Sequence, residues 1–135
     1  ILSADVYKYL SLASPHLDLI EEFTLPEILS FQAGCKAYAP GWDTHRLIEF
    51  SGLGNHRTKP IARFSSGMKQ RVRLLLALAS DTPMVLLDEP CSNLDQHSVA
   101  WYRELLQTFR QGRTIVVASN HRGEEYPDCD TVIEL

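Results

Sequence analysis

The chain has 135 residues, 44% of them hydrophobic, which is enough for one domain with its own core. The 17 acidic residues outnumber the 13 Lys and Arg residues and give a net charge of −4, so bulk charge provides no reason to expect nucleic-acid binding. Three widely spaced cysteines do not make a disulfide framework and favour a reducing compartment. Because no apolar stretch approaches about 18 residues, we expect neither a membrane-spanning helix nor an export signal.

The first half of the chain predicts a short strand followed by two helices. Residues 7–13 ("YKYLSLA") form a β-prone run. A helix is expected over 24–38, because "TLPE" at its start has the pattern of a capping box, in which the glutamate reaches back to the capping threonine. A second short helix is expected over 44–54, closed by one of the two glycines at its end.

The second half alternates helices with apolar strands. Apolar residues recur at helical spacing over 67–79 and again over 99–109. The run 84–88 ("MVLLD") is apolar without alternation, as is typical of a parallel strand covered on both faces, and 114–119 and 131–135 are further strand candidates. Strands separated by helices predict an α/β fold with a parallel sheet.

Polar residues follow two of these strands at the edge where ligands bind in parallel sheets. Asp88 ends one strand and Glu89 follows it, while Asn120 and His121 follow another. We find no Ser or Cys in a GxSxG-type elbow and no paired histidine spacing, so neither nucleophilic catalysis nor a protein-only metal site is supported. An acidic pair after a buried strand is the arrangement by which nucleotide hydrolases hold Mg²⁺ with one carboxylate and polarise a water with the next.

The string "FSSGMKQRV" (64–72) opens the helix predicted over 67–79. Ser65, Ser66 and Gly67 offer hydroxyl groups and open backbone amides at the positive end of the helix dipole, which predicts a phosphate site. Taken alone, the same residues are more typical of an ordinary helix cap than of a phosphate site.

Two other features of this region are interpreted as ordinary surface. The segment "GLGNHRTK" (52–59) is not a P-loop, because Arg57 stands where the second glycine is needed. Six basic residues are expected on solvated faces: Arg57, Lys59, Arg63, Lys69, Arg71 and Arg73.

Four motifs in this order resemble the ATP-binding cassette (ABC) ATPases. "FSSGMKQRV", "MVLLDEP", "SNLD" (92–95) and "SNH" (119–121) are similar to the signature motif, Walker B strand, D-loop and switch histidine of that family. The "SSGM" form resembles that of bacterial export-type cassette subunits. The resemblance implies a partial P-loop NTPase (RecA-like) fold in which a helical subdomain, about 20–80, is inserted into a core formed by 1–19 and 81–135.

Two parts of the family pattern are missing. There is no Walker A motif, so the resemblance implies that this half lies upstream of Ile1, with its strand between 114–119 and 131–135 in the sheet. The 135 residues alone are therefore expected to be inactive. Ala13 stands where the family has its Q-loop glutamine, and Ser11 or Ser14 is an alternative source of an oxygen.

The resemblance assigns ATP and Mg²⁺ as cofactors and gives roles to individual residues. Asp88 is expected to hold Mg²⁺ through water, Glu89 to polarise the attacking water and His121 to contact the γ-phosphate.

Further residues are assigned to contacts between subunits. Ser65, Ser66 and Gly67 are expected to contact the nucleotide of a second ABC ATPase subunit, with Asp95 at the dimer interface. Residues 15–27 match the region that receives a transmembrane permease subunit, which implies a cytoplasmic protein peripheral to the inner membrane.

We therefore expect ATP hydrolysis that powers membrane transport. Chromosome-maintenance ATPases are disfavoured, because only about fifty residues separate Pro15 from Phe64 and they show no sustained heptads. Ribosome-associated cassettes usually have Asn-His-Leu-Asp where this chain has Ser-Asn-Leu-Asp. A degenerate, non-hydrolysing partner subunit remains an alternative, although Glu89 is present.

Overall fold

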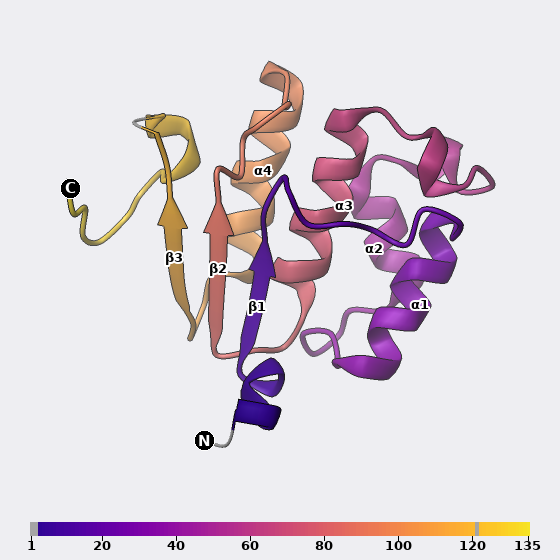
Figure 1. Cartoon of the computed structure of the whole chain (residues 1–135), viewed down its shortest axis with the longest axis horizontal. Coiled ribbons are helices and arrows are strands. Elements are labelled where there is room, and N and C mark those ends of the chain that lie inside the picture. Colours follow the sequence, from indigo (N-terminus) through magenta and orange to yellow (C-terminus); the bar gives the residue numbers. More distant parts are fainter. Residues whose placement is uncertain (1–2, 121) are drawn as a thin grey trace.

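The computed structural model describes residues 3–120 and 122–135, which form a three-stranded parallel sheet beside four α-helices (Figure 1). The strands lie in the order β1 (Leu10–Ala13), β2 (Met84–Asp88) and β3 (Thr114–Ala118). The helices are α1 (Leu25–Cys35), α2 (Thr44–Ser51), α3 (Ser66–Ala79) and α4 (Gln96–Phe109). This arrangement confirms the predicted α/β class and parallel sheet. None of the helices in the described residues has the length and apolar content that a membrane span requires.

Strand β1 is shorter than the predicted run 7–13. Ser3–Lys8 forms a 3-10 helix, and the strand begins at Leu10, opposite Met84. The Met84 amide donates to the Tyr9 carbonyl at 3.2 Å, but the residue before it, Pro83, has no amide to continue the ladder. The ladder therefore cannot extend before Leu10, because the neighbouring strand β2 begins at Met84.

Helix α1 begins as predicted but ends before Tyr38. The Glu27 carboxylate accepts a hydrogen bond from the Thr24 amide at 2.9 Å, as the capping-box pattern predicts. After Cys35 the backbone becomes extended, and the Ala39 amide donates to the Ala79 carbonyl at 2.9 Å. Pairing with the end of α3 thus replaces the last helical turn that the sequence suggested.

Helix α2 closes at Gly52, the first of the two predicted glycines. Gly52 has a φ of 69°, a left-handed conformation that glycine adopts without a Cβ clash, and its amide donates to the Glu49 carbonyl at 3.3 Å.

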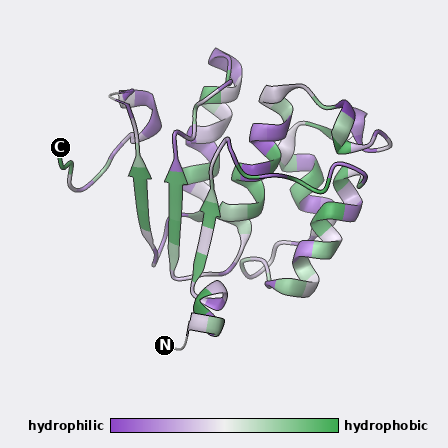
Figure 2. Ribbon diagram, in the orientation of Figure 1, coloured by the Kyte–Doolittle hydropathy of each residue, from purple (hydrophilic) through white to green (hydrophobic). Residues whose placement is uncertain are grey.

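Helices α3 and α4 cover one face of the sheet, and the other face is open (Figure 1). On the open face Leu12, Leu86 and Val116 lie opposite one another across the three strands. Leu12 is 47% exposed and Val116 48% exposed, and Figure 2 shows the apolar character of the strands. The expectation that 84–88 is covered on both faces is therefore wrong within the described chain.

The two edges of the sheet differ. At the β1 edge, the Lys36 ammonium donates to the Leu10 carbonyl at 2.6 Å and occupies an acceptor that another strand could otherwise use. At the β3 edge, β2 is the only strand among the described residues that pairs with Thr114–Ala118, so the outer side of β3 has no strand partner there. Residues 131–135 have no regular structure, so the predicted last strand is wrong here. A strand needs a ladder partner, and β3 does not pair with this segment.

The expectation that the basic residues of α3 face solvent is wrong for Arg71. Arg71 is only 7% exposed, and its guanidinium donates to the Ser51 carbonyl at 2.8 Å while lying 4.7 Å from the centre of the Trp101 ring. Burial lowers the pKa of Arg71. Lys69 and Arg73 are half-buried, whereas Arg57 and the other two basic residues before α3 are exposed as predicted.

Because Arg71 joins α2, α3 and α4, we expect Arg71→Ala to lower the free energy of unfolding by roughly 2–4 kcal/mol, through an unpaired carbonyl and lost packing. Urea denaturation followed by circular dichroism measures this change. The matched control is Arg57→Ala at an exposed position, expected to stay within about 0.5 kcal/mol. Equal effects of the two substitutions would contradict the buried role of Arg71.

Candidate functional site

The carboxyl ends of the three strands bring polar side chains together at one edge of the sheet. Ser14 follows β1, and its hydroxyl donates to Asp88 Oδ2 at the end of β2 at 3.2 Å. Asn120 follows β3, and its Nδ2 donates to Glu89 Oε1 at 2.5 Å. The predicted meeting of the acidic pair with the residues after β3 is thus confirmed through Asn120. His121, the predicted imidazole of this edge, lies outside the described residues.

The backbone of Glu89 has an unusual conformation. Its φ is 42°, in the left-handed region that a residue with a Cβ rarely adopts. The Glu89 amide donates to the Ala118 carbonyl at 2.8 Å, and the Glu89 carbonyl accepts from the Ser92 amide at 3.0 Å. Surrounding hydrogen bonds therefore hold a strained residue in place, and such strain is commonly found at functional sites.

The two serines proposed as substitutes for the Q-loop glutamine have different environments. The Ser11 hydroxyl is buried and shares a 2.8 Å hydrogen bond with Thr82, which precedes β2. The Ser14 hydroxyl, as described above, contacts Asp88. Ala13 itself is 1% exposed and contributes to the core. Of the two alternatives, Ser14 is the one whose oxygen reaches the acidic pair.

The signature residues form the N-terminus of α3. Ser65 caps the helix, and its hydroxyl accepts a hydrogen bond from the Met68 amide at 3.2 Å. Ser65 and Ser66 are both exposed. A Cβ on Gly67 would lie 2.9 Å from the Asn93 carbonyl oxygen, so a larger residue would force this turn apart. The start of α3 and the turn after β2 are therefore in close contact.

Asp95 is the N-cap of α4. Its carboxylate accepts a hydrogen bond from the Ser98 amide at 2.8 Å, and this bond lowers the pKa of Asp95. The side chain is exposed, and the chain reaches it through a turn in which Asn93 has a φ of 63°. Asp95 thus remains ionised at neutral pH on the surface beside the start of α3.

Cys91, in the same turn, does not supply a nucleophile. It is fully buried, and burial together with Glu125 and Glu124 raises the pKa of its thiol to about 12. Among the described residues no group of three His, Cys, Asp or Glu side chains is close enough to hold a metal ion.

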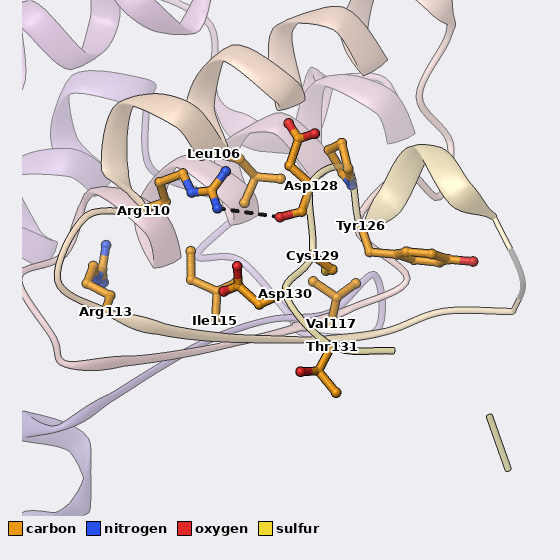
Figure 3. Close-up of a pocket in the computed structure, with 11 residues that line it drawn as sticks. Leu106, Arg110, Arg113, Ile115, Val117, Tyr126, Asp128, Cys129, Asp130 and Thr131 are labelled. Carbon is orange, nitrogen blue, oxygen red and sulfur yellow. Dashed lines mark hydrogen bonds between the residues drawn. The ribbon is translucent and has the colours of Figure 1, made fainter. Parts of the chain in front are cut away.

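A separate groove of about 350 Å³ lies on the outer side of β3 (Figure 3). Ile115 and Val117 line it from the strand, and residues 126–131 line it from the other side. Arg110 spans part of it and donates to the Asp128 carbonyl at 3.5 Å. The groove contains neither the acidic pair nor the signature residues.

Three residues near the site received no role from the sequence. Asn120 was visible inside the "SNH" motif, directly before the histidine. Gln70 and Glu125 are fully buried polar residues that contact the turn after Glu89, through the Pro90 carbonyl and the Cys91 amide. The sequence offers no signal for them, because their burial depends on helices and loops that are distant in the chain.

Comparisons with known proteins agree with this geometry. The family described as ABC transporter matches residues 7–92. An uncharacterised ABC transporter ATP-binding protein of Bacillus subtilis is 30% identical over 129 residues, which cover 95% of this chain and 59% of that protein. A lantibiotic transport ATP-binding protein of Streptococcus pyogenes is 36% identical over 75 residues, or 55% of this chain and 33% of that protein.

A solved dimeric structure of an ATP-binding cassette in a post-hydrolysis state, bound to ADP and phosphate, has the same fold. It superposes with a TM-score of 0.75 at 19% identity and covers 93% of this chain and 60% of that one. The chain therefore spans about three fifths of the length of the Bacillus relative and of this structure. The match over residues 7–92, the relatives and the shared fold together show that the chain belongs to the ABC transporter family.

Proposed function

We propose that the chain acts in the ATPase subunit of an ABC transporter, where ATP hydrolysis powers membrane transport. The observation that carries this proposal is the meeting of Asp88 and Glu89 with polar groups from both neighbouring strand ends, Ser14 and Asn120. Acidic side chains at this position of a parallel sheet suit phosphate chemistry that depends on positioning and charge stabilisation. The export-type assignment of the signature remains a prediction.

Asp88 and Ser14 fit a magnesium site that is completed by a nucleotide. Mg²⁺ is usually bound through one or two carboxylates, several waters and substrate phosphates rather than by a cage of protein ligands. One carboxylate with a hydroxyl 3.2 Å away matches that donor set. When bound, Mg²⁺ supplies positive charge that offsets the phosphate oxygens.

Glu89 is proposed as the general base. One of its carboxylate oxygens accepts the Asn120 hydrogen bond at 2.5 Å, and the other has no partner among the described residues and is proposed to accept a proton from the attacking water. The held backbone conformation of Glu89 limits the directions in which this carboxylate can point. His121, whose role comes from the resemblance alone, is proposed to stabilise charge on the γ-phosphate.

The signature residues are proposed to act on a nucleotide held by a second ABC ATPase subunit. Ser65, Ser66 and Gly67 lie at the exposed N-terminus of a 14-residue helix, where backbone amides and the helix dipole favour a phosphate group. Asp95 is proposed to lie at the same dimer interface. The close approach of Gly67 to Asn93 supports communication between the signature and the D-loop of one subunit.

The Walker A strand of a complete nucleotide-binding domain is proposed to pair with the open edge of β3. The groove between β3 and residues 126–131 and the lack of a strand over 131–135 support this placement. We also propose that about 20–80 form the helical subdomain and that 1–19 and 81–135 belong to the catalytic core.

A transmembrane permease subunit is proposed to contact the region around α1. Phe31 is 53% exposed, and its ring lies 5.9 Å from that of Phe23 in edge-to-face contact. These rings, with Pro26, line a shallow apolar hollow that suits a helix from a partner. The subunit is accordingly proposed to be cytoplasmic and peripheral to the inner membrane, without a nucleic-acid partner.

The first test replaces Glu89 in a subunit that joins this chain to a Walker A segment. Glu89→Gln preserves side-chain size but removes the base, so turnover should fall by roughly 10²-fold or more while ATP binding survives. The variant should accumulate as an ATP-loaded dimer in size-exclusion chromatography with Mg-ATP. Asp88→Asn is the contrasting variant and should weaken nucleotide binding as well. The non-hydrolysing alternative is favoured if wild type and Glu89→Gln show the same low turnover and elution.

The second test concerns the signature. Ser65→Arg places a bulky cation where the partner's nucleotide is proposed to lie, so ATP-driven dimerisation and turnover should be lost while ATP binding to the monomer stays nearly intact. Calorimetry and light scattering measure the two quantities separately. Equal loss of binding and turnover would place the signature in the site of its own subunit.

The third test separates the two candidate Q-loop serines. Ser14→Ala removes the hydroxyl that contacts Asp88, so the Mg²⁺ concentration that gives half-maximal turnover should rise roughly 10-fold. Ser11→Ala is the matched control, because its hydroxyl bonds to Thr82 instead, and its Mg²⁺ dependence should not change. Identical Mg²⁺ titrations for both variants would remove Ser14 from the metal site.

A further inference from the structure

The peptide unit that joins Pro90 to Cys91 is held from both sides by buried side chains. Gln70 of α3 donates from Nε2 to the Pro90 carbonyl at 3.1 Å. Glu125, at the end of the short 3-10 helix Gly123–Glu125, accepts a hydrogen bond from the Cys91 amide at 3.0 Å. Both side chains are 0% exposed. We call these two side chains and the peptide unit the peptide clamp.

The two bonds of the peptide clamp act on one rigid body. A peptide unit is planar, and its carbonyl and amide groups point to opposite sides of the chain. The plane cannot rotate without breaking the bond to Gln70 or the bond to Glu125. Breaking either bond leaves a buried polar group unpaired, which is unfavourable.

Each residue of the clamp is itself anchored. The backbone carbonyl of Glu125 accepts a hydrogen bond from the Tyr102 hydroxyl of α4 at 2.6 Å. The Gln70 side-chain oxygen accepts from the Arg73 guanidinium at 3.5 Å. The clamp therefore joins α3, α4 and the segment after residue 121 at a single peptide.

A buried carboxylate at position 125 is energetically less favourable than an apolar side chain that only fills the same space. Its Oε1 bonds to Cys91, but its Oε2 is buried and has no hydrogen-bond partner within the part of the chain that the structure describes. Burying a polar group without a partner is unfavourable, and an apolar side chain of similar size would avoid that penalty. The one bond to the Cys91 amide distinguishes Glu125 from such a side chain.

The clamped peptide lies immediately after the proposed catalytic base. Glu89 directly precedes Pro90, whose carbonyl belongs to the clamped peptide. The Glu89 carbonyl accepts a hydrogen bond from the Ser92 amide across the same turn. Rotation of the Pro90–Cys91 plane would disturb this turn and the left-handed backbone of Glu89. A small displacement of a catalytic group is enough to slow a reaction substantially.

We propose that Gln70 and Glu125 are positioning residues that hold the Glu89 carboxylate in its catalytic orientation. The inference rests on the proposed function, since it concerns the same hydrolytic step. Through the clamp, two elements are connected to the turn that carries Glu89. These are α3, which carries the signature residues, and the segment after residue 121.

The test uses Glu125→Met in the subunit that joins this chain to a Walker A segment. Methionine preserves length and burial but accepts no comparable hydrogen bond, so kcat should fall roughly 10- to 100-fold. KM for ATP should change by less than about threefold, because both clamp side chains are fully buried and so are not expected to contact a bound nucleotide. Glu125→Gln retains an oxygen acceptor and should recover most of kcat. The matched control is Glu124→Met, whose native carboxylate instead pairs with Arg122, and its kcat should stay near that of wild type.

Two further measurements separate positioning from a general structural role. The amide proton of Cys91 should move upfield and exchange faster in Glu125→Met, but not in Glu125→Gln or Glu124→Met, when observed by NMR. Gln70→Met should lower kcat similarly, and the double variant should lose much less than the product of the two single effects, because both act on one peptide.

Several results would overturn the proposal. An unchanged kcat in folded Glu125→Met would make Glu125 merely structural, and so would multiplicative effects of the two methionine variants. Failure of Glu125→Gln to recover kcat despite a native-like Cys91 amide would remove the acceptor as the cause. If the subunit without substitutions shows no turnover, the proposed function is overturned, and the positioning role with it. If that subunit turns over normally and the variants do so equally well, only the positioning role is overturned.

Discussion

The pairing of β2 with a parallel strand on each side is the constraint on which the rest of the structure depends. Parallel strands end at the same edge of a sheet, so the residues that follow them must lie close together. Asp88 is paired with Ala118 in the last position of the ladder, and the Glu89 amide then bonds to the Ala118 carbonyl. This pairing brings Ser14, the acidic pair and Asn120 within hydrogen-bonding distance of their partners.

Buried polar side chains then attach the helices to that edge. Gln70 and Glu125 bond to one peptide of the turn after β2, and Arg71 bonds from α3 to the end of α2. Each of these groups would be costly to bury alone, so each is retained in the core with a backbone partner. The turn that carries Glu89 is consequently connected to elements far away in the sequence.

One face of the sheet and the outer edge of β3 are uncovered within the described residues. Its helix-free face exposes Leu12 and Val116, and the outer edge of β3 is unpaired among the described residues. Residues 126–131 lie across the groove from β3, and 131–135 do not form a strand. The pairing of β2 with β1 and β3 is therefore enough to position the acidic pair. No further strand beyond β3 is needed for this arrangement.

The sequence by itself determined the α/β class, most helix boundaries and the acidic pair, because periodicity, caps and the order of short motifs are local properties of the chain. It also indicated that Gly67 lies in the first turn of a helix, but only the tertiary structure gave the reason that glycine is needed there, which is the carbonyl of Asn93. The structure alone showed that the Ser14 hydroxyl, and not that of Ser11, contacts Asp88, and it placed Arg71 inside the core. It also ended α1 early and left 131–135 without a strand. Each of these outcomes depends on a partner distant in the sequence, and no local pattern records which distant group will satisfy a hydrogen bond.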